Sequence, residues 1–200
     1  MVKLTGDGGL VVTTRTRRNT APGELELVRA FINTAQLERG QDELEHPADL
    51  RRWLVARELL AATAPVGEDD LAVALAVREA LREMAGANTG RPPSEPACAA
   101  LDALSEASGL RPNFEPDGTV ALAPRAVGVT GGLGRLLGIV VAAVGTGGWS
   151  RLKTCRNPAC RWAFYDNTRN RSGVWCDMSG CGSRAKARAY YARRRASADG

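Results

Sequence analysis

The stretch 155–181 reads CRNPACRWAFYDNTRNRSGVWCDMSGC, and its cysteines decide how this part of the chain folds. Cys155 and Cys160 enclose four residues, Cys176 and Cys181 enclose four more, and fifteen residues separate the two pairs. Two close pairs of thiolates can surround one tetrahedral ion, with the segment between them forming a hairpin. The spacing therefore predicts a Zn²⁺ site with four cysteine ligands.

Other uses of these cysteines fit the sequence less well. The chain shows no secretory signal, which argues against disulfides, and a redox dithiol usually has two residues between its cysteines rather than four. An iron–sulfur cluster stays open as an alternative to zinc. The fifth cysteine, Cys98, stands alone in an alanine-rich run and is expected to be a small core residue.

The predicted metal site is expected to be structural. A catalytic zinc keeps one ligand position open for water, whereas four cysteines close the coordination shell. The single histidine, His46, lies outside this segment, and residues 151–195 contain neither histidine nor glutamate. One histidine also leaves little to activate a serine or threonine nucleophile, so we expect no catalytic residues and no enzyme activity.

Charge is distributed unevenly along the chain. Residues 151–195 hold 12 Lys and Arg against only Asp166 and Asp177, whereas residues 1–150 hold 15 basic and 19 acidic residues. This polarity favours a polyanionic partner for the C-terminal part. The charge balance changes near Thr146 to Trp149, where glycines cluster, and predicts two domains, 1–146 and 147–200.

A basic helix is predicted from Ser183, a natural N-cap after Gly182, to Ala196. Its alanines share one stripe and are expected to pack on the metal core: Ala185, Ala189, Ala192 and Ala196. The other faces carry Arg and Lys with interleaved tyrosines, an arrangement that suits phosphate and base contacts. Candidate nucleic-acid contacts are Arg169, Arg171, Arg184, Lys186, Arg188 and Arg195. The alternatives are a protein-binding helix or a solvated one.

The body before this segment has the apolar periodicity of helices. We expect helices from Glu24 to near Gly40, from Pro47, from just after Glu68, over 97–108 and over 133–144. A hairpin turn is expected at Pro116-Asp117-Gly118. The run 10–14 is β-like, and a basic stretch continues to Arg18. No apolar run reaches the length of about 20 residues that spans a membrane, so we expect a cytoplasmic protein.

Arg78 is unusual because it lies in the middle of an apolar helical stripe. An unpaired buried charge is costly, so it needs a partner. One interpretation is an ion pair with a carboxylate such as Asp49 or Glu58. The other is a pocket in which Arg78, with Asn33 and Trp53, binds a small anionic ligand.

The C-terminal motif resembles the CGNR zinc finger. The matching residues are Cys155-Arg-Asn-Pro-Ala-Cys160, Phe164-Tyr165-Asp166, Arg169-Asn170-Arg171, Trp175-Cys176, Met178 and the run 181–188 beginning Cys181-Gly182-Ser183-Arg184. Ser183 stands where the family usually has Asn.

The N-terminal part resembles the domain named Putative stress-induced transcription regulator (ABATE). The matching pieces are Phe31-Ile32-Asn33-Thr34, Asp49-Leu50, Trp53-Leu54 and the Leu-rich helix around Arg78. This second resemblance implies a transcription regulator of actinobacterial type.

Together these observations predict a mainly α fold with a small β-hairpin, ending in a treble-clef-like zinc module and its basic helix. The predicted function is a zinc-finger DNA-binding transcription regulator, whose N-terminal domain is a candidate sensor of a small ligand. The alternative is a zinc-stapled protein- or RNA-interaction module without a DNA operator. No membrane partner is expected, and the sequence does not specify the oligomeric state.

Overall fold

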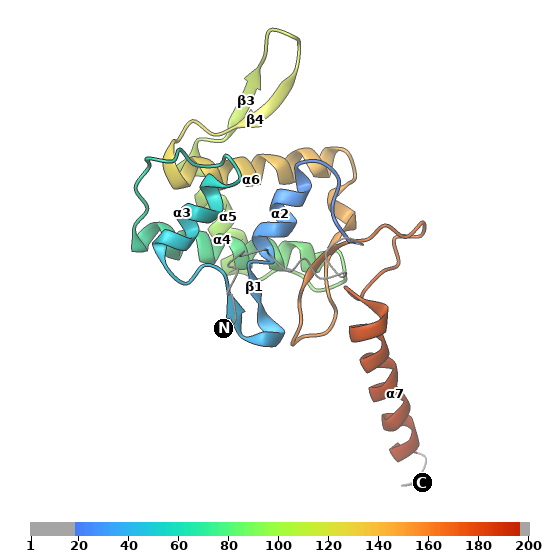
Figure 1. Cartoon of the computed structure of the whole chain (residues 1–200). Helices are drawn as coiled ribbons and strands as arrows, with labels where there is room; N and C mark the ends of the chain where they lie inside the picture. Colours follow the sequence, from blue (N-terminus) through green and yellow to red (C-terminus); the bar gives the residue numbers. More distant parts are fainter. Residues whose placement is uncertain (1–18, 197–200) are drawn as a thin grey trace, which may run out of the picture.

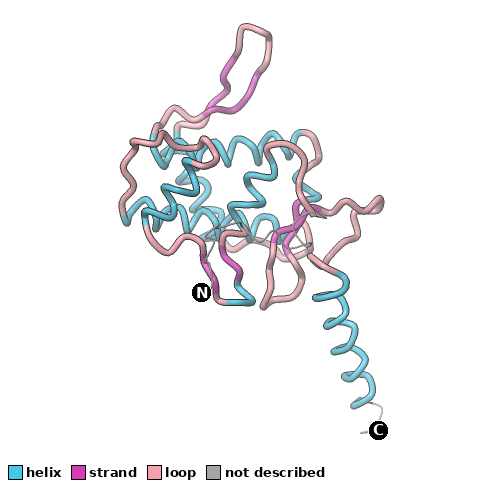
Figure 2. The backbone as a smooth tube through the Cα atoms, in the orientation of Figure 1, coloured by secondary structure: helices cyan, strands magenta, loops and turns pink. Residues whose placement is uncertain are grey.

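The computed structural model describes residues 19–196 (Figures 1 and 2). The predicted β-like run 10–14 and the basic stretch to Arg18 lie outside these residues. The elements follow the order α2 (Leu25–Ile32), β1 (Ala35–Gln36), η1 (Leu37–Arg39), β2 (Gln41–Asp42), α3 (Pro47–Val55), α4 (Glu68–Ala87), α5 (Glu95–Ser108), β3 (Arg111–Phe114), β4 (Val120–Ala123), α6 (Gly128–Gly145), η2 (Trp149–Arg151), β5 (Leu152–Thr154), β6 (Ala163–Tyr165), η3 (Met178–Gly182) and α7 (Ser183–Ala196). The predicted class, mainly helical with small β-hairpins, is confirmed.

Local capping sets several helix starts. Pro47 opens α3, and the Asp49 carboxylate accepts a hydrogen bond from the His46 backbone N–H at 3.0 Å. Asp70 does the same for the backbone N–H of Gly67 before α4, at 2.9 Å. The Ser94 hydroxyl caps α5, which therefore begins at Glu95, two residues before its predicted start.

The first helix is shorter than predicted. Periodicity suggested a helix to near Gly40, but α2 ends at Ile32, and Ala35 lies in a small β1–β2 hairpin closed by η1. The fully buried Arg82 of α4 donates to the backbone carbonyls of Ile32 and Ala35, which removes these acceptors from a continuing helix. Tertiary hydrogen bonds therefore override the local helical preference.

Helix α6 packs against α2, α5 and β4, and it begins at Gly128 rather than Leu133. Its glycines allow close approach: a Cβ on Gly134 would lie 2.7 Å from the Cβ of Ser108, and one on Gly138 would lie 2.8 Å from the Leu122 carbonyl oxygen. By length and composition α6 could span a membrane, but 56% of its 18 residues are buried within the fold. Its contacts make it a core helix of this body.

Strands β5 and β6 pair antiparallel and rest on the helical body. Leu152, Ala163 and Tyr165 belong to the same hydrophobic core as the helices. Helix α7 then projects away from the body, as does the β3–β4 hairpin on the opposite side (Figure 1). The sequence division at 146/147 stays a prediction.

Candidate metal centre and basic helix

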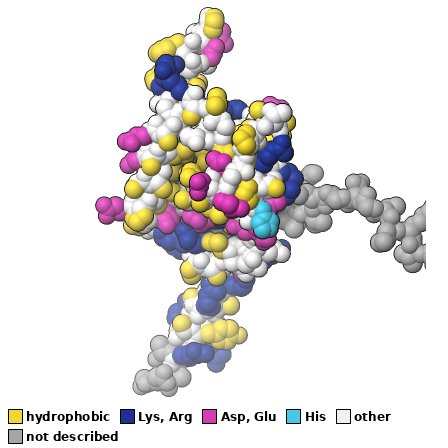
Figure 3. All heavy atoms as spheres, turned by 90° about the vertical axis from the view of Figure 1, so that its left-hand side faces the viewer, with side chains coloured by type: hydrophobic (Ala, Val, Ile, Leu, Met, Phe, Trp, Pro, Cys, Tyr) yellow, Lys and Arg dark blue, Asp and Glu magenta, His cyan; other side chains and the backbone are white. Residues whose placement is uncertain are grey.

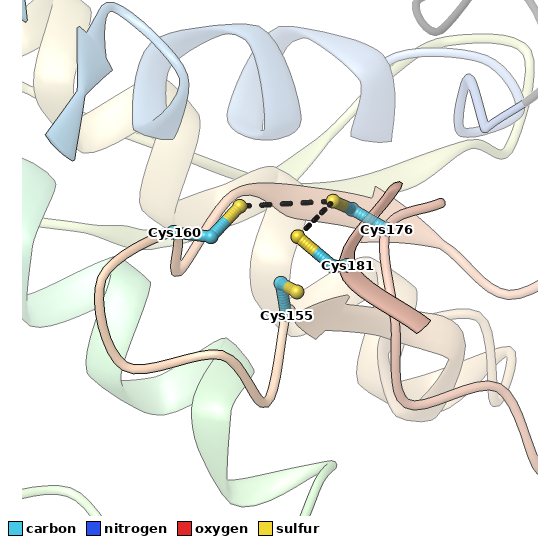
Figure 4. A group of neighbouring side chains, drawn as sticks. All are labelled: Cys155, Cys160, Cys176 and Cys181. Atoms are coloured by element: carbon cyan, nitrogen blue, oxygen red, sulfur yellow. Dashed lines mark hydrogen bonds between the residues drawn. The ribbon is translucent and has the colours of Figure 1, made fainter. Parts of the chain in front are cut away.

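The four cysteines of the predicted site converge on one point (Figure 4). All four Sγ atoms lie within 4.8 Å of one another, with 3.7 Å between Cys160 and Cys176 and 3.9 Å between Cys176 and Cys181. A tetrahedral ion with metal–sulfur bonds of about 2.3 Å places its ligand sulfurs about 3.8 Å apart. A disulfide would need about 2.05 Å, and none is formed. The cluster has the size of a single metal ion's thiolate shell.

Two turns supply the ligands. Cys155 directly follows β5, and Cys160 lies at a tight turn in which its own N–H and that of Arg161 both donate to the Asn157 carbonyl. Cys176 ends the long loop after β6, and Cys181 lies in the η3 turn that leads into α7. All four side chains are buried, and a second cluster of apolar side chains, including Phe164, surrounds them. This hairpin-then-helix arrangement is treble-clef-like, as predicted.

The thiols depend on one another electrostatically. Hydrogen bonds from Cys160 and Cys176 lower the pKa of Cys155, which favours its thiolate form. The pKa values of Cys160 and Cys176 are raised by their hydrogen bonds within the cluster and by burial, because further negative charge is unfavourable there. A divalent cation would compensate that charge and hold four thiolates together. The donor set therefore fits a metal ion.

Two protein groups donate directly to Cys181. The Nδ2 of Asn157 lies 3.8 Å from its Sγ, and Nη2 of Arg184 lies 3.2 Å from the same atom. Such donors offset part of the thiolate charge and orient the ligand. Sequence reasoning placed Arg184 among the DNA contacts and missed its role at the metal centre. Its position three residues after a cysteine ligand, on the first turn of a helix, could have indicated it.

A buried ion pair organises the loop between the two cysteine pairs. Asp166 and Lys153 are 2% and 4% exposed, and their charged atoms lie 2.8 Å apart. The Asp166 carboxylate also accepts from the backbone N–H groups of Thr168 and Gly173, and Lys153 donates to the carbonyls of Arg171 and Gly173. Sequence reasoning missed this clamp, although an Asp two residues before a Thr is a turn signal.

We expect Asp166→Asn to destabilise the module by about 2–3 kcal/mol at pH 7, because Lys153 loses its buried counter-ion. Burial alone would raise the pKa of Asp166, but the hydrogen bonds from Lys153, Thr168 and Gly173 prevail and lower it to about 2. The ionised form therefore stabilises the fold above the unfolded pKa of about 3.9, and this contribution is lost as the pH falls through about 2.

Denaturant unfolding of the metal-loaded proteins at pH 7 measures the difference directly. The matched control is Asp102→Asn, which changes an exposed carboxylate on α5 and should leave stability within about 0.5 kcal/mol of the parent. Equal stability of Asp166→Asn and Asp102→Asn would show that the clamp contributes nothing. A gap between the parent and Asp166→Asn that changes between pH 8 and pH 6, where Asp166 stays ionised and the thiolates still hold the metal, would contradict the pKa assignment.

The predicted cations occupy three different settings. Lys186, Arg188 and Arg195 are exposed along α7, and Arg169 is exposed in the loop after β6. Arg171, with a φ of 52°, lies 3.4 Å from the Ser150 hydroxyl, and Arg184 is paired within the protein. The loop and α7 leave the metal centre in different directions (Figure 1). The structure therefore brings the cations of α7 together but keeps those of the loop apart from them.

Two expectations about α7 are wrong. The alanine stripe does not pack on the metal core, because among its described side chains Ala189 and Ala192 are exposed and Ala185 is half-buried. Ser183 is not an N-cap, since it has helical φ and ψ and its hydroxyl donates to the Met178 carbonyl. The π-helical turn η3 runs directly into α7, so the cap belongs one turn earlier. There the Asp177 carboxylate accepts from the Ser179 N–H.

Cys98 also differs from its expectation, because it is exposed on α5 rather than part of the core. A cavity of about 710 Å³ that the sequence did not predict lies beside the metal centre, where Trp175, Asp177 and Met178 form part of its wall.

The three candidate ligand contacts have protein partners or lie in the core. Arg78 forms a two-point ion pair with Asp42, both oxygen–nitrogen distances being 2.7 Å, and its Nε lies 3.0 Å from Glu79. The ion-pair interpretation is therefore confirmed, but Asp42 takes the place of Asp49 or Glu58. Trp53 is buried with its ring 5.2 Å from that of Phe31.

Asn33 fastens the metal module to the helical body. Its side-chain amide donates to the Ala163 carbonyl and accepts from the Ala163 N–H, each at 2.8 Å. This pairing joins the end of α2 to β6. Asn33, which the sequence suggested as a ligand contact, therefore joins the helical body to the metal module.

Comparison with known families gives two matches along the chain. The CGNR zinc finger matches residues 151–194, which contain the four-cysteine centre and most of α7. The family described as Putative stress-induced transcription regulator (ABATE) matches residues 25–146, from α2 to the end of α6. A search of curated proteins found no match to the chain. Since the second match covers more than half of its length, the chain belongs to the ABATE family, and it carries a CGNR zinc finger after the ABATE domain.

Proposed function

We propose that this protein binds DNA through helix α7 and acts as a transcription regulator, with zinc at the four-cysteine centre holding that helix in place. The proposal rests on the charge and the exposure of helix α7. Residues 183–195 hold six Lys and Arg and no acidic residue, and all are exposed except the half-buried Ala185. In Figure 3 dark blue basic groups gather along this projecting helix, whereas the body above it also carries acidic ones.

The physical chemistry of α7 favours a polyanionic partner. Fourteen residues make a marginal helix when little packs against it, and basic residues without a single acidic one add mutual repulsion. Phosphates would neutralise this repulsion and release counterions. Arginine predominates among these cations, and its planar guanidinium group can donate two hydrogen bonds at once to phosphate oxygens or to the major-groove edge of guanine.

The metal is assigned as zinc on the geometry of its ligands. Sulfur separations of 3.7 and 3.9 Å suit one ion shared by four thiolates. An iron–sulfur cluster places several metal atoms between its cysteines and would hold the sulfurs farther apart. Four thiolates leave no position for water, so the ion's role is structural, and we propose a regulator without enzyme activity.

Ligand sensing by the ABATE domain stays a prediction. Arg78 does not support it, because its guanidinium nitrogens already contact Asp42, Glu79 and Thr34. The rival functions, RNA binding and protein binding, use the same exposed helix. Measuring the binding of duplex DNA and of single-stranded RNA distinguishes these functions.

The test measures binding of the zinc-loaded chain to duplex DNA and to single-stranded RNA across a range of salt concentrations. For duplex DNA the log–log slope should be about −0.9 for each phosphate contacted. The double change Lys186→Ala with Arg188→Ala should weaken binding at least tenfold. It should also make the slope shallower by about one for each phosphate that these two side chains neutralise in the parent.

The matched control is Arg52→Ala, which removes an arginine that is 72% exposed on α3, away from the metal centre. It should leave affinity and slope nearly unchanged. If Lys186→Ala with Arg188→Ala keeps both zinc and full DNA affinity, the DNA interface is not α7. Tighter binding of RNA than of duplex DNA would support the RNA rival, and no binding of either would leave the protein-interaction rival.

A further inference from the structure

Arg184 is clamped between the metal centre and the helical body. Its Nη2 donates to the Sγ of Cys181 at 3.2 Å, and its Nη1 lies 2.5 Å from Oε1 of Glu38. The hydrogen bond to Glu38, and next the one to Cys181, raise the pKa of the guanidinium above its usual value. Although its side chain is 48% exposed, Arg184 is directed at two protein groups and not only at solvent.

Glu38 projects from an arm that is fixed at its base. It lies in η1, the turn between β1 and β2, where Ala35 pairs with Asp42. Two buried arginines of α4 hold this base: Arg78 by its ion pair with Asp42, and Arg82 by hydrogen bonds to backbone carbonyls that include that of Ala35. Helix α4 of the ABATE domain therefore holds the base of the arm that carries Glu38.

Helix α7 has few other means of fixing its direction. The element that it contacts most is η3, the turn directly before it, and its side chains beyond Ala185 are exposed as far as Arg195. A projecting helix joined to the protein at one end can swing about that end. The contact between Glu38 and Arg184 gives the first turn of α7 a second point of attachment to the helical body, in addition to the chain through η3.

We infer that Glu38 is a positioning residue for DNA binding: through Arg184 it sets the direction in which α7 leaves the metal centre. Arg184 takes part in the ion pair with Glu38 instead of contacting DNA. The inference rests on the proposed function. It describes a contiguous physical path from α4 through the β1–β2 arm to the metal centre and α7, and the coupling along that path is measurable.

The change Glu38→Ala separates this role from simple electrostatics. Removing a carboxylate beside a DNA-binding helix reduces repulsion of phosphates, so charge alone predicts tighter binding. Loss of positioning predicts weaker binding. We expect Glu38→Ala and Arg184→Ala each to weaken DNA binding about fivefold, and the double variant to be no weaker than the weaker single variant, because both remove one coupled interaction.

Two further variants serve as references. Glu38→Gln keeps an oxygen that can accept from Arg184 and should recover part of the affinity. Glu45→Ala removes an exposed carboxylate a few residues farther along the same segment and should leave binding equal or slightly tighter. Metal content should stay at one ion per chain in all of these proteins, because the four ligands are unchanged.

The direction of α7 can also be measured without DNA. Spin labels on Ala192→Cys in α7 and Val73→Cys in α4, in a zinc-loaded Cys98→Ala background, report the distance between the helix and the body. We expect a single narrow distribution of label-to-label distances in the parent. This distribution should broaden in Glu38→Ala and not in Glu45→Ala. An unbroadened distribution, or DNA binding by Glu38→Ala as tight as the parent's or tighter, would overturn the inference alone. Failure of the parent to bind DNA would overturn the proposed function.

Discussion

Removing the metal ion is expected to unfold the C-terminal module, residues 151–196. Metal binding contributes apparent free energies of about 10–16 kcal/mol in small zinc modules, far more than packing of so short a segment can supply. The buried shell here is made of the four thiols and a few aromatic side chains. Without the ion, the raised pKa values of Cys160 and Cys176 leave those thiols protonated and the cluster without its central bonds.

The helical body should keep its helices but lose stability in the same experiment. Leu152, Ala163 and Tyr165 of the module are part of its hydrophobic core, and Asn33 is hydrogen bonded to Ala163. Hydrogen exchange with and without a chelator should show loss of protection over residues 151–196 and a smaller loss over α2 and α4, which contact β6 and β5.

Variants separate loss of the ion from loss of a thiol. Cys181→Ser should abolish stoichiometric metal binding and reproduce the unfolding caused by the chelator. Cys98→Ser, which changes the exposed cysteine on α5, should retain one ion per chain, measured by elemental mass spectrometry. A protected, protease-resistant module in the metal-free protein would contradict the structural role of the ion.

Arg78→Leu should destabilise the ABATE domain by about 3 kcal/mol. Breaking a buried ion pair by removing one partner costs about 3–5 kcal/mol, and the lower end applies because the side chain of Asp42 is 30% exposed while that of Arg78 is 6% exposed. Leucine keeps the apolar volume but leaves Asp42 without its cation and Thr34 without a donor. Denaturant unfolding of the zinc-loaded protein measures the change.

The control removes a surface arginine with a similar ion pair. Arg52 pairs with Asp49 on α3, but its side chain is 72% exposed, so Arg52→Leu should change stability by less than about 1 kcal/mol. Melting with and without inorganic phosphate tests the ligand alternative. If Arg78→Leu is as stable as the parent and loses a phosphate-induced stabilisation that the parent shows, Arg78 binds an anion rather than holding the β1–β2 arm.

The sequence by itself determined the features that depend on neighbouring residues. The spacing of the four cysteines fixed the ligand set, because a tight turn between two thiolates and a hairpin between two pairs are properties of short chain segments. Pro47 and Asp70 marked helix starts for local reasons: the fixed φ of proline suits the first helical position, and the Asp70 carboxylate accepts from a backbone N–H three residues away. Pro116-Asp117-Gly118 marked the β3–β4 turn for the same local reason. The one-sided charge of α7 follows from composition.

Tertiary structure decided every feature whose partner is distant in the chain. The partner of Arg78 lies 36 residues away, and that of Asn33 lies 130 residues away, so periodicity showed that Arg78 needs a partner without showing which one. The end of α2 depends on Arg82, whose bonds replace helical ones. The alanine stripe of α7 had the right spacing for packing, but Ala189 and Ala192 are exposed in the fold. Spacing along a helix states which side chains share a face, and only the fold determines what that face meets.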